Sequence, residues 1–278
     1  GFLSCGMGAG IEDRAKVTIE KQGDKYMVKV GVVELGQGNL TAFAQIAADA
    51  LGVPVEAVEV IAGDTGRTHD CGSTAASRST YITGNAIIKA AQDLRAGGGR
   101  QGTGESVFPE SSLKHLGVGL PHVMYTFLVN VVKLALDPLT GEIKLLEALA
   151  VTEAGQVVNP VLLDAQIQGG LGQGIGYALL EEFAFNARGQ AAQKDLSTYL
   201  IPTAKDVCDI QNLTVEAYEN SGPFGVKGAA EVGTVCVAPA VTGALMDGWG
   251  IYVTRLPISK EEITRQLRRK GVVPTKAV

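Results

Sequence analysis

Glycine is the residue that most restricts what this chain can fold into. It accounts for 36 of the 278 residues and follows no Gly-X-Y period, so it belongs to loops and close-packed turns rather than to a fibrous repeat. Much of it gathers, with hydroxyl and amide side chains, in four stretches: 34–38, 63–80, 166–176 and 225–233. Because glycine adopts positive φ and lets the backbone approach other groups closely, these stretches predict tight turns around a packed core.

Apolar periodicity predicts the regular elements of the first half of the chain. Alternation of apolar and polar residues is typical of a β-hairpin, and apolar residues at i, i+3 and i+4 are typical of a helix. The predicted elements are a hairpin of strands 16–19 and 27–33 about a turn at 22–24, a helix over 40–51, a strand at 58–61 and a helix over about 83–94. Loops at the ends of such elements commonly hold ligands.

The two halves share a hairpin-then-helix plan, although the sequence shows no convincing repeat. The predicted elements are a hairpin of strands 129–136 and 143–151 about the turn at 137–141, a helix from Asn159-Pro160 toward Glu182, a strand at 213–217, a helix over 237–247 and a last helix from Ser259. Glu262 stands three residues after Ser259, as in a capping box. The glycines inside the 159–182 helix favour either tight helix packing or a ligand against bare backbone.

The composition of 95–119, rich in Gly, Ser, Glu and Pro, indicates a surface connection between two subdomains. We therefore expect an α+β protein with two α/β subdomains, each a mixed sheet packed with helices. The first is predicted over 1–118 and the second, with the loops of Gln166 and Glu231, over 119–278.

Charge and cysteine usage argue against several classes of protein. The net charge of −5, with scattered basic residues, argues against broad nucleic-acid binding. Four separated cysteines without a C-x-x-C pair give no zinc or iron–sulfur motif and suggest a reducing compartment; Cys71 is the one that could lie near a ligand. No apolar run approaches the ~20 residues of a membrane helix, and the start lacks a signal peptide, so a cytoplasmic protein without a membrane partner is expected.

Glu231 is the candidate catalytic residue, because it stands in a glycine-rich loop directly before an apolar segment. A carboxylate there could act as a base, although an acid among glycines is also typical of a solvated turn. The three other glycine-rich stretches favour the catalytic interpretation, since together they suggest one binding surface.

The positions that carry a resemblance to a known family are Gly36-Gln37-Gly38 with Thr41, Thr74-Ala75-Ala76-Ser77-Arg78-Ser79, Asn159-Pro160 with Gln166 and Gly169-Gly170, and Gly225-Val226-Lys227-Gly228-Ala229-Ala230-Glu231. In this order they resemble the C-terminal half of the molybdenum-cofactor-binding subunit of the xanthine dehydrogenase and aldehyde oxidase family of molybdenum hydroxylases. The pattern is most similar to split members, such as nicotinate dehydrogenase, in which two polypeptides make the molybdenum site.

The resemblance implies which residues bind molybdopterin, as the mononucleotide or the cytosine dinucleotide form. They are Gly36, Gln37, Gly38, Thr41, Thr74, Ala75, Ala76, Ser77, Arg78, Ser79, Gln166, Lys227 and Gly228. The cofactor's dithiolene holds the molybdenum in this family, so no metal ligand is expected from the chain. Arg78 either adds positive charge or pairs with a nearby acid, and Lys227 either orients substrate or stabilises developing charge.

The resemblance also implies the reaction. Glu231 matches the family's base, which takes a proton so that an oxygen from water attacks an electron-poor carbon. The expected activity is hydroxylation of an N-heterocycle or oxidation of an aldehyde, with a second molybdopterin subunit and with iron–sulfur and FAD subunits as partners. A non-catalytic scaffold subunit is the alternative. The chain departs from the family's pattern at Ala230 and Glu153 and in a short connection over 96–104.

Overall fold

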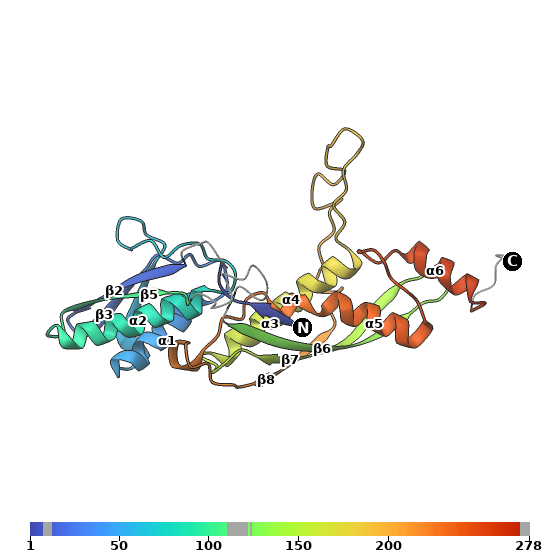
Figure 1. Cartoon of the computed structure of the whole chain (residues 1–278). Coiled ribbons are helices and arrows are strands. Elements are labelled where there is room, and N and C mark those ends of the chain that lie inside the picture. Colours follow the sequence, from blue (N-terminus) through green and yellow to red (C-terminus); the bar gives the residue numbers. More distant parts are fainter. Residues whose placement is uncertain (8–12, 110–121, 123, 273–278) are drawn as a thin grey trace, which may run out of the picture.

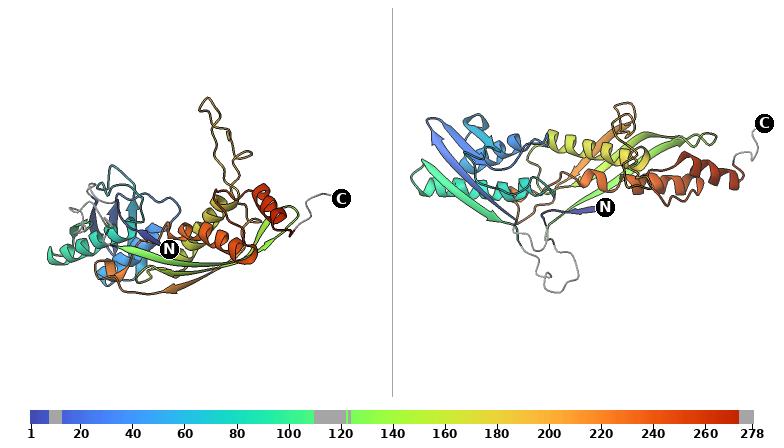
Figure 2. Two further views of the ribbon diagram at one scale, coloured as in Figure 1. Left: turned by 45° about the vertical axis from the view of Figure 1, so that its right-hand side comes forward. Right: turned by 90° about the horizontal axis from the view of Figure 1, so that it is seen from above.

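The computed structural model describes residues 1–7, 13–109, 122 and 124–272. It contains two four-stranded sheets, and helices pack on one side of each (Figure 1). The two sheets lie side by side along an elongated molecule, so the loops that leave their facing ends meet between them (Figure 2). Two separate clusters of buried apolar side chains form the cores.

The first sheet has the strand order β4-β3-β2-β5. Its elements are β2 Arg14–Gln22, β3 Lys25–Val30, α1 Asn39–Leu51, the 3₁₀ turn η1 Val55–Ala57, β4 Val58–Ala62, α2 Ser79–Ala96 and β5 Gln101–Val107. Strand β2 pairs antiparallel with β3 and β5, whereas β3 pairs parallel with β4 across the α1 connection. Buried side chains of β2, α1 and α2, among them Val17, Phe43 and Tyr81, make up the first core.

The second sheet has the strand order β1-β6-β7-β8. Its elements and covering helices are β1 Phe2–Ser4, β6 Tyr125–Leu136, β7 Ile143–Glu153, α3 Pro160–Leu179, β8 Asp209–Val215, the 3₁₀ turn η3 Pro223–Gly225, α4 Val232–Val235, α5 Val237–Trp249 and α6 Lys260–Arg269. Strand β6 pairs antiparallel with β1 and β7, and β7 pairs parallel with β8. Leu128, Ile167 and Val241 are buried in the second core.

Most predicted elements are present, with shifted ends. Helix α2 begins at Ser79 rather than near 83, because the Arg78 carbonyl already accepts the first turn's hydrogen bond from Ile82 N at 2.9 Å. Strand β8 covers 209–215 rather than 213–217, since its parallel pairing with β7 starts at Asp209. The predicted cap of the last helix is present: Ser259 accepts from Glu262 N. The start of the chain also pairs with β6, which no sequence pattern indicated.

The prediction of an irregular surface connection over 95–119 is wrong for residues 101–107, which form strand β5. The glycines there permit packing. A Cβ on Gly104 would lie 2.1 Å from the carbonyl oxygen of Ala86 in α2, and one on Gly102 would lie 2.2 Å from that of Ala90. Helix α2 therefore lies directly on the backbone of β5. The predicted subdomain boundary at 118/119 falls outside the described residues.

The glycines of α3 divide between two roles. A Cβ on Gly170 or Gly174 would lie under 3.0 Å from Gly233 or Val237, so these two positions bring α3 close to α4 and α5. A Cβ on Gly169 or Gly172 would meet nothing within 4 Å. Tight packing thus explains Gly170 and Gly174, whereas Gly169 and Gly172 lie on an open side of α3.

The segment Val232–Trp249 is long and apolar enough to cross a membrane by length and composition alone. Core helices of globular domains share these properties. In this structure the segment is broken into α4 and α5, and its Val237, Val241 and Leu245 are buried in the second core.

Replacing Gly104 by Val tests the packing of α2 on β5. The added side chain has no space against the α2 backbone, so we expect a loss of about 1–3 kcal/mol or more in the free energy of unfolding. Urea denaturation measures it. The matched control is Gly243→Ala, an exposed helical position with open space, which should gain roughly 0.5–1 kcal/mol. A Gly104→Val protein as stable as the wild type would contradict the described packing.

Candidate functional site

A cavity of about 450 Å³ opens between the two sheets' loop ends, and all four glycine-rich stretches border it or lead into it. Its lining comes from 35–42, 74–80, 154–166 and 226–231. The predicted site residues that line it are Gly36, Gln37, Gly38, Thr74, Ala75, Ser77, Arg78, Ser79, Gln166, Lys227, Gly228 and Glu231. Thr41 and Ala76 are not among the lining residues. The structure thus brings together residues separated by up to 195 positions of sequence, from 36 to 231.

Ser77 joins the first sheet's loop to the loop of Glu231. Its Oγ donates a hydrogen bond to Oε2 of Glu231 and accepts from the backbone N–H groups of Ala230 at 3.1 Å and Glu231 at 3.3 Å. Ser77 has φ of 50°, in the left-handed region that non-glycine residues seldom adopt. A Cβ on Gly228 would lie 1.6 Å from the Ser77 carbonyl oxygen, so only glycine permits this approach.

Glu231 is the acid that the two loops present to the cavity. Glu231 is an exposed residue in this chain, but neighbouring atoms partly bury its carboxyl group, and this partial burial raises the pKa; the backbone N–H groups of Glu231, Ala76 and Ser77 oppose the shift by stabilising the charged form. The balance leaves the pKa above its ordinary value. A carboxylate with a raised pKa is a stronger base than a free one, provided that the pH keeps it ionised.

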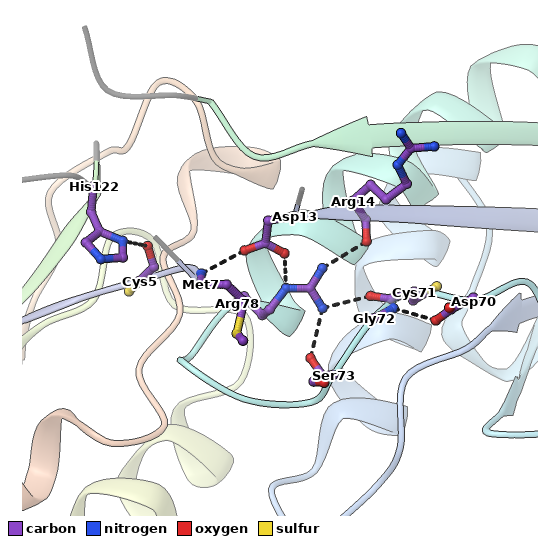
Figure 3. Close-up of polar contacts among 10 residues, drawn as sticks. All are labelled: Cys5, Met7, Asp13, Arg14, Asp70, Cys71, Gly72, Ser73, Arg78 and His122. Carbon is purple, nitrogen blue, oxygen red and sulfur yellow. Dashed lines mark hydrogen bonds and ion pairs between the residues drawn. The ribbon is translucent and has the colours of Figure 1, made fainter. Parts of the chain in front are cut away.

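Arg78 pairs with an acid, which decides between the two roles that the sequence left open. The buried guanidinium donates through Nε to Asp13 and through its terminal nitrogens to the carbonyls of Cys71 at 2.7 Å, Ser73 at 2.9 Å and Arg14 at 2.8 Å (Figure 3). Asp13 also accepts from Met7 N at 2.9 Å. Arg78 therefore holds the 71–79 loop in place, and Asp13 balances its charge.

Glu34 organises the loop of Gln37 and was not predicted as a site residue. Its carboxylate accepts from the N–H groups of Gly36 at 2.9 Å, Gly38 at 2.8 Å and Leu40 at 3.1 Å, at the start of α1. Burial raises the pKa of Glu34, but these hydrogen bonds outweigh it and lower the pKa overall. The sequence signal that could have identified Glu34 is an acid just before Gly-x-Gly at the start of a predicted helix.

The Gln37 amide folds back on its own loop. It accepts from Leu35 N at 2.6 Å and donates to the Val33 carbonyl at 3.0 Å. The same segment is tied to the 71–79 loop, because Val33 N donates to Thr74 Oγ1 at 3.0 Å. A direct hydrogen bond thus links two of the predicted cofactor-binding loops.

The ammonium group of Lys227 is held by protein groups, although Lys227 lines the cavity. Its Nζ lies 2.7 Å from Oε2 of Glu153, donates to the Tyr125 carbonyl at 2.9 Å and lies 5.5 Å from the centre of the Phe127 ring. Glu153 also accepts from Gly155 N. This pair anchors the 225–231 loop to the second sheet. The predicted roles of Lys227, to orient a substrate or to stabilise developing charge, stay predictions.

Two cysteines are buried and bonded to backbone. Cys71, predicted as a candidate near a ligand, does not line the cavity; its thiol donates to the Lys16 carbonyl and accepts from Gly31 N, so that interpretation is wrong. Cys5 was not singled out, yet its thiol donates to the Gly228 carbonyl at 3.3 Å. Burial raises the pKa of Cys5 to about 11, so it remains a neutral donor under the Glu231 loop.

The lining fits a polar, anionic organic cofactor. Its polar side chains are mostly neutral amides and hydroxyls, from Gln37, Asn39, Thr74, Ser79, Thr80, Gln156, Asn159 and Gln166. Glu231 is the single acid among the described residues that line it, while Arg78 and Lys227 are each paired with an acid. Neutral donors satisfy phosphate and pterin oxygens without an unpaired buried charge. The residues described also contain no group of three or more His, Cys, Asp or Glu that could hold a metal.

Several known proteins are similar to this chain. A family model described as a molybdopterin cofactor-binding domain matches residues 2–101 and 97–208. A probable xanthine dehydrogenase subunit of Bacillus subtilis is 30% identical over 96% of this chain and 41% of its own length. The 6-hydroxypseudooxynicotine dehydrogenase complex subunit gamma of Paenarthrobacter nicotinovorans is 30% identical over 95% of this chain and 38% of its own. The chain spans about two fifths of these relatives.

Solved structures share the fold. The aldehyde oxidoreductase from Desulfovibrio desulfuricans matches with a TM-score of 0.83 and 25% identity over 95% of this chain and 31% of its own. Quinoline 2-oxidoreductase from Pseudomonas putida matches with a TM-score of 0.82 and 24% identity over 96% of this chain and 41% of its own. The family model covers most of the chain. The chain therefore belongs to the molybdopterin cofactor-binding family, in the xanthine dehydrogenase and aldehyde oxidoreductase group of molybdenum hydroxylase subunits.

Proposed function

We propose that this chain is the catalytic molybdopterin-binding subunit of a multi-subunit molybdenum hydroxylase. The assembled enzyme hydroxylates an N-heterocycle or oxidises an aldehyde, with water as the oxygen donor. The observation that carries the proposal is the position of Glu231: it borders the same cavity as the Gln37, Ser77 and Gln166 segments, and its pKa is raised there.

The cofactor would lie between three segments of the chain. Gly36, Gln37 and Gly38 contribute one wall, the 74–79 loop a second, and Gln166 on α3 a third. When bound, molybdopterin supplies the metal centre and the two-electron redox chemistry of the reaction. The loops of this chain are ordered before the cofactor binds, because hydrogen bonds and ion pairs of Glu34, Arg78 and the Lys227–Glu153 pair hold them in place. Little conformational entropy then remains to be lost on binding.

Glu231 has the properties of the general base. Ser77 Oγ holds Oε2 of the carboxylate, so the side chain is oriented before any substrate arrives. Ser77 and the neighbouring N–H groups stabilise the ionised form, while burial favours the neutral form, and the raised pKa improves the carboxylate's ability to take a proton near neutral pH.

We propose that partner subunits complete the enzyme. The chain spans about two fifths of its relatives, and the P. nicotinovorans relative is named as a subunit of a complex. We therefore propose a second molybdopterin polypeptide of the split, nicotinate dehydrogenase-like type, with iron–sulfur and FAD subunits that carry the electrons away. The four free cysteines are consistent with a reducing, cytoplasmic location. The proposal involves neither nucleic acid nor a membrane.

The variant Glu231→Gln tests the catalytic role. The amide keeps the shape of the side chain but cannot accept the proton, so we expect unchanged molybdenum content and a turnover lower by roughly 10²-fold or more. The complex is purified through a tag on this chain and assayed with a panel of N-heterocycles and aldehydes and an acceptor dye. Glu142→Gln, an exposed acid in the β6–β7 turn, is the control. Full turnover by Glu231→Gln with molybdenum present would support the scaffold alternative instead.

The pH profile tests the link between Ser77 and Glu231. A base must be ionised, so kcat/KM should rise with pH through the apparent pKa of the carboxyl group. Ser77→Ala removes a donor to the charged form, which raises that pKa further and moves the acid limb to higher pH. Ser221→Ala removes a comparable serine bond to Glu219, outside the cavity, and should leave the limb in place. An unmoved limb in Ser77→Ala would exclude Glu231 as the titrating base.

A further inference from the structure

The second sheet has an apolar outer face. Every second residue along β6 and β7 points toward the helices, and Leu128, Ala148 and Thr152 are buried there. Six large apolar side chains point the other way, each about half exposed: Phe2 51%, Phe127 50%, Val129 59%, Val131 56%, Leu213 56% and Val215 51%. We call these six residues the apolar face. No helix among the described residues covers it, since α3, α4 and α5 lie on the opposite side of the sheet (Figures 1 and 2).

The register places apolar residues of neighbouring strands next to each other. Phe2 of β1 lies opposite Phe127 of β6, and their ring centroids are 6.4 Å apart. Val129 of β6 lies opposite Val151 of β7, which in turn pairs with Leu213 of β8. The row of Val129, Val151 and Leu213 is therefore apolar across three strands, whereas in the neighbouring row Glu153 stands between Phe127 and Val215.

The first sheet shows what a solvated outer face looks like in this chain. Its outward positions on β2, β3 and β5 carry charged and polar groups, and ion pairs link Lys29 to Glu20 at 2.6 Å and Arg14 to Glu105 at 3.5 Å. An antiparallel sheet with one face in water normally alternates in this way. The outward face of the second sheet also carries an exposed ion pair, between Lys133 and Glu147 at 3.0 Å, but the six positions of the apolar face are apolar where the first sheet has charged or polar groups. Exposed apolar surface of this kind marks an interaction site.

The apolar face reaches the candidate active site. Phe127 pairs across the strands with Glu153, and the Lys227 ammonium lies over the Phe127 ring while it bonds to Glu153. Lys227 belongs to the loop that carries Glu231. A polypeptide seated on the apolar face would therefore also cover the ion pair that anchors this loop, and would exclude water from it.

We propose that the apolar face docks the polypeptide that supplies the part of the molybdopterin subunit that this chain lacks; this rests on the proposed function. The relatives support this occupant. They match 95–96% of this chain with only 31–41% of their own length, so in them the same fold is joined to much further chain. A second copy of this chain would cover the apolar face but would supply none of the missing part.

Site-specific crosslinking in the purified complex tests the docking surface. The photoreactive residue benzoylphenylalanine replaces Val129 or Leu213, and replaces Leu139 in the exposed β6–β7 turn as the control. We expect crosslinks from 129 and 213, identified by mass spectrometry, to a polypeptide similar to the part of the relatives outside the matched region. Crosslinks to a second copy of this chain or to an iron–sulfur or flavin polypeptide would overturn the proposal, and so would none.

Charge substitution provides a second test. In the isolated full chain, Val129→Lys with Leu213→Lys should melt within about 2 °C of the wild type, because both positions are exposed. In the assembled enzyme the buried ammonium groups should lower the yield of complex by about tenfold or more. Leu139→Lys should assemble normally. Normal assembly of the double variant would overturn the proposal. Neither the crosslinks nor the yield of complex depends on turnover. Failure of the docking proposal can therefore be distinguished from failure of the proposed function, which would appear as full turnover by Glu231→Gln.

Discussion

The contact between Ser77 and the 228–231 loop is the interaction on which the site depends. It joins a loop of the first sheet to a loop of the second, and the sheets otherwise have separate cores. The contact needs an unusual backbone on both sides, because Ser77 adopts positive φ and Gly228 lies against its carbonyl oxygen. Strained conformations of this kind persist where the surrounding structure fixes them and cluster at functional sites. Together with the hydrogen bond from Asn159 Nδ2 to Gln45 Oε1 at 3.0 Å, this contact joins the two walls of the cavity.

The charged side chains around the cavity are paired so that the Glu231 carboxylate forms no ion pair with Arg78 or Lys227. Arg78 and Lys227 would each place a buried positive charge there, but Asp13 and Glu153 pair with them. Glu34 is used to bind the loop before α1. The Glu231 carboxylate is stabilised by a hydroxyl and by N–H groups rather than by a cation of the described loops, so its pKa responds chiefly to burial. The same arrangement that holds the loops thus sets the acid–base properties of the site.

Local pattern predicted the fold class and the positions of the main elements, because hairpins such as 16–33 and helices such as 40–51 depend on periodicity within a short window. It failed at 101–107, because a glycine-rich strand that packs against a helix has the same composition as a glycine-rich linker. The loops that line the cavity were found through their resemblance to a family. Asp13 and Glu153 were not found as partners of Arg78 and Lys227, because such pairs join positions 65 and 74 residues apart and leave no local signal.

The central claim is that separate loops of this chain surround one molybdopterin group with Glu231 as the acid beside it. Anomalous X-ray diffraction at the molybdenum edge, from crystals of the assembled enzyme, tests it most directly. We predict a molybdenum peak inside the cavity bordered by Gln37, Ser77 and Gln166, with the Glu231 carboxylate closer to it than any other acid of this chain. A peak outside that cavity, or one nearer to another carboxylate of the chain, would contradict the account.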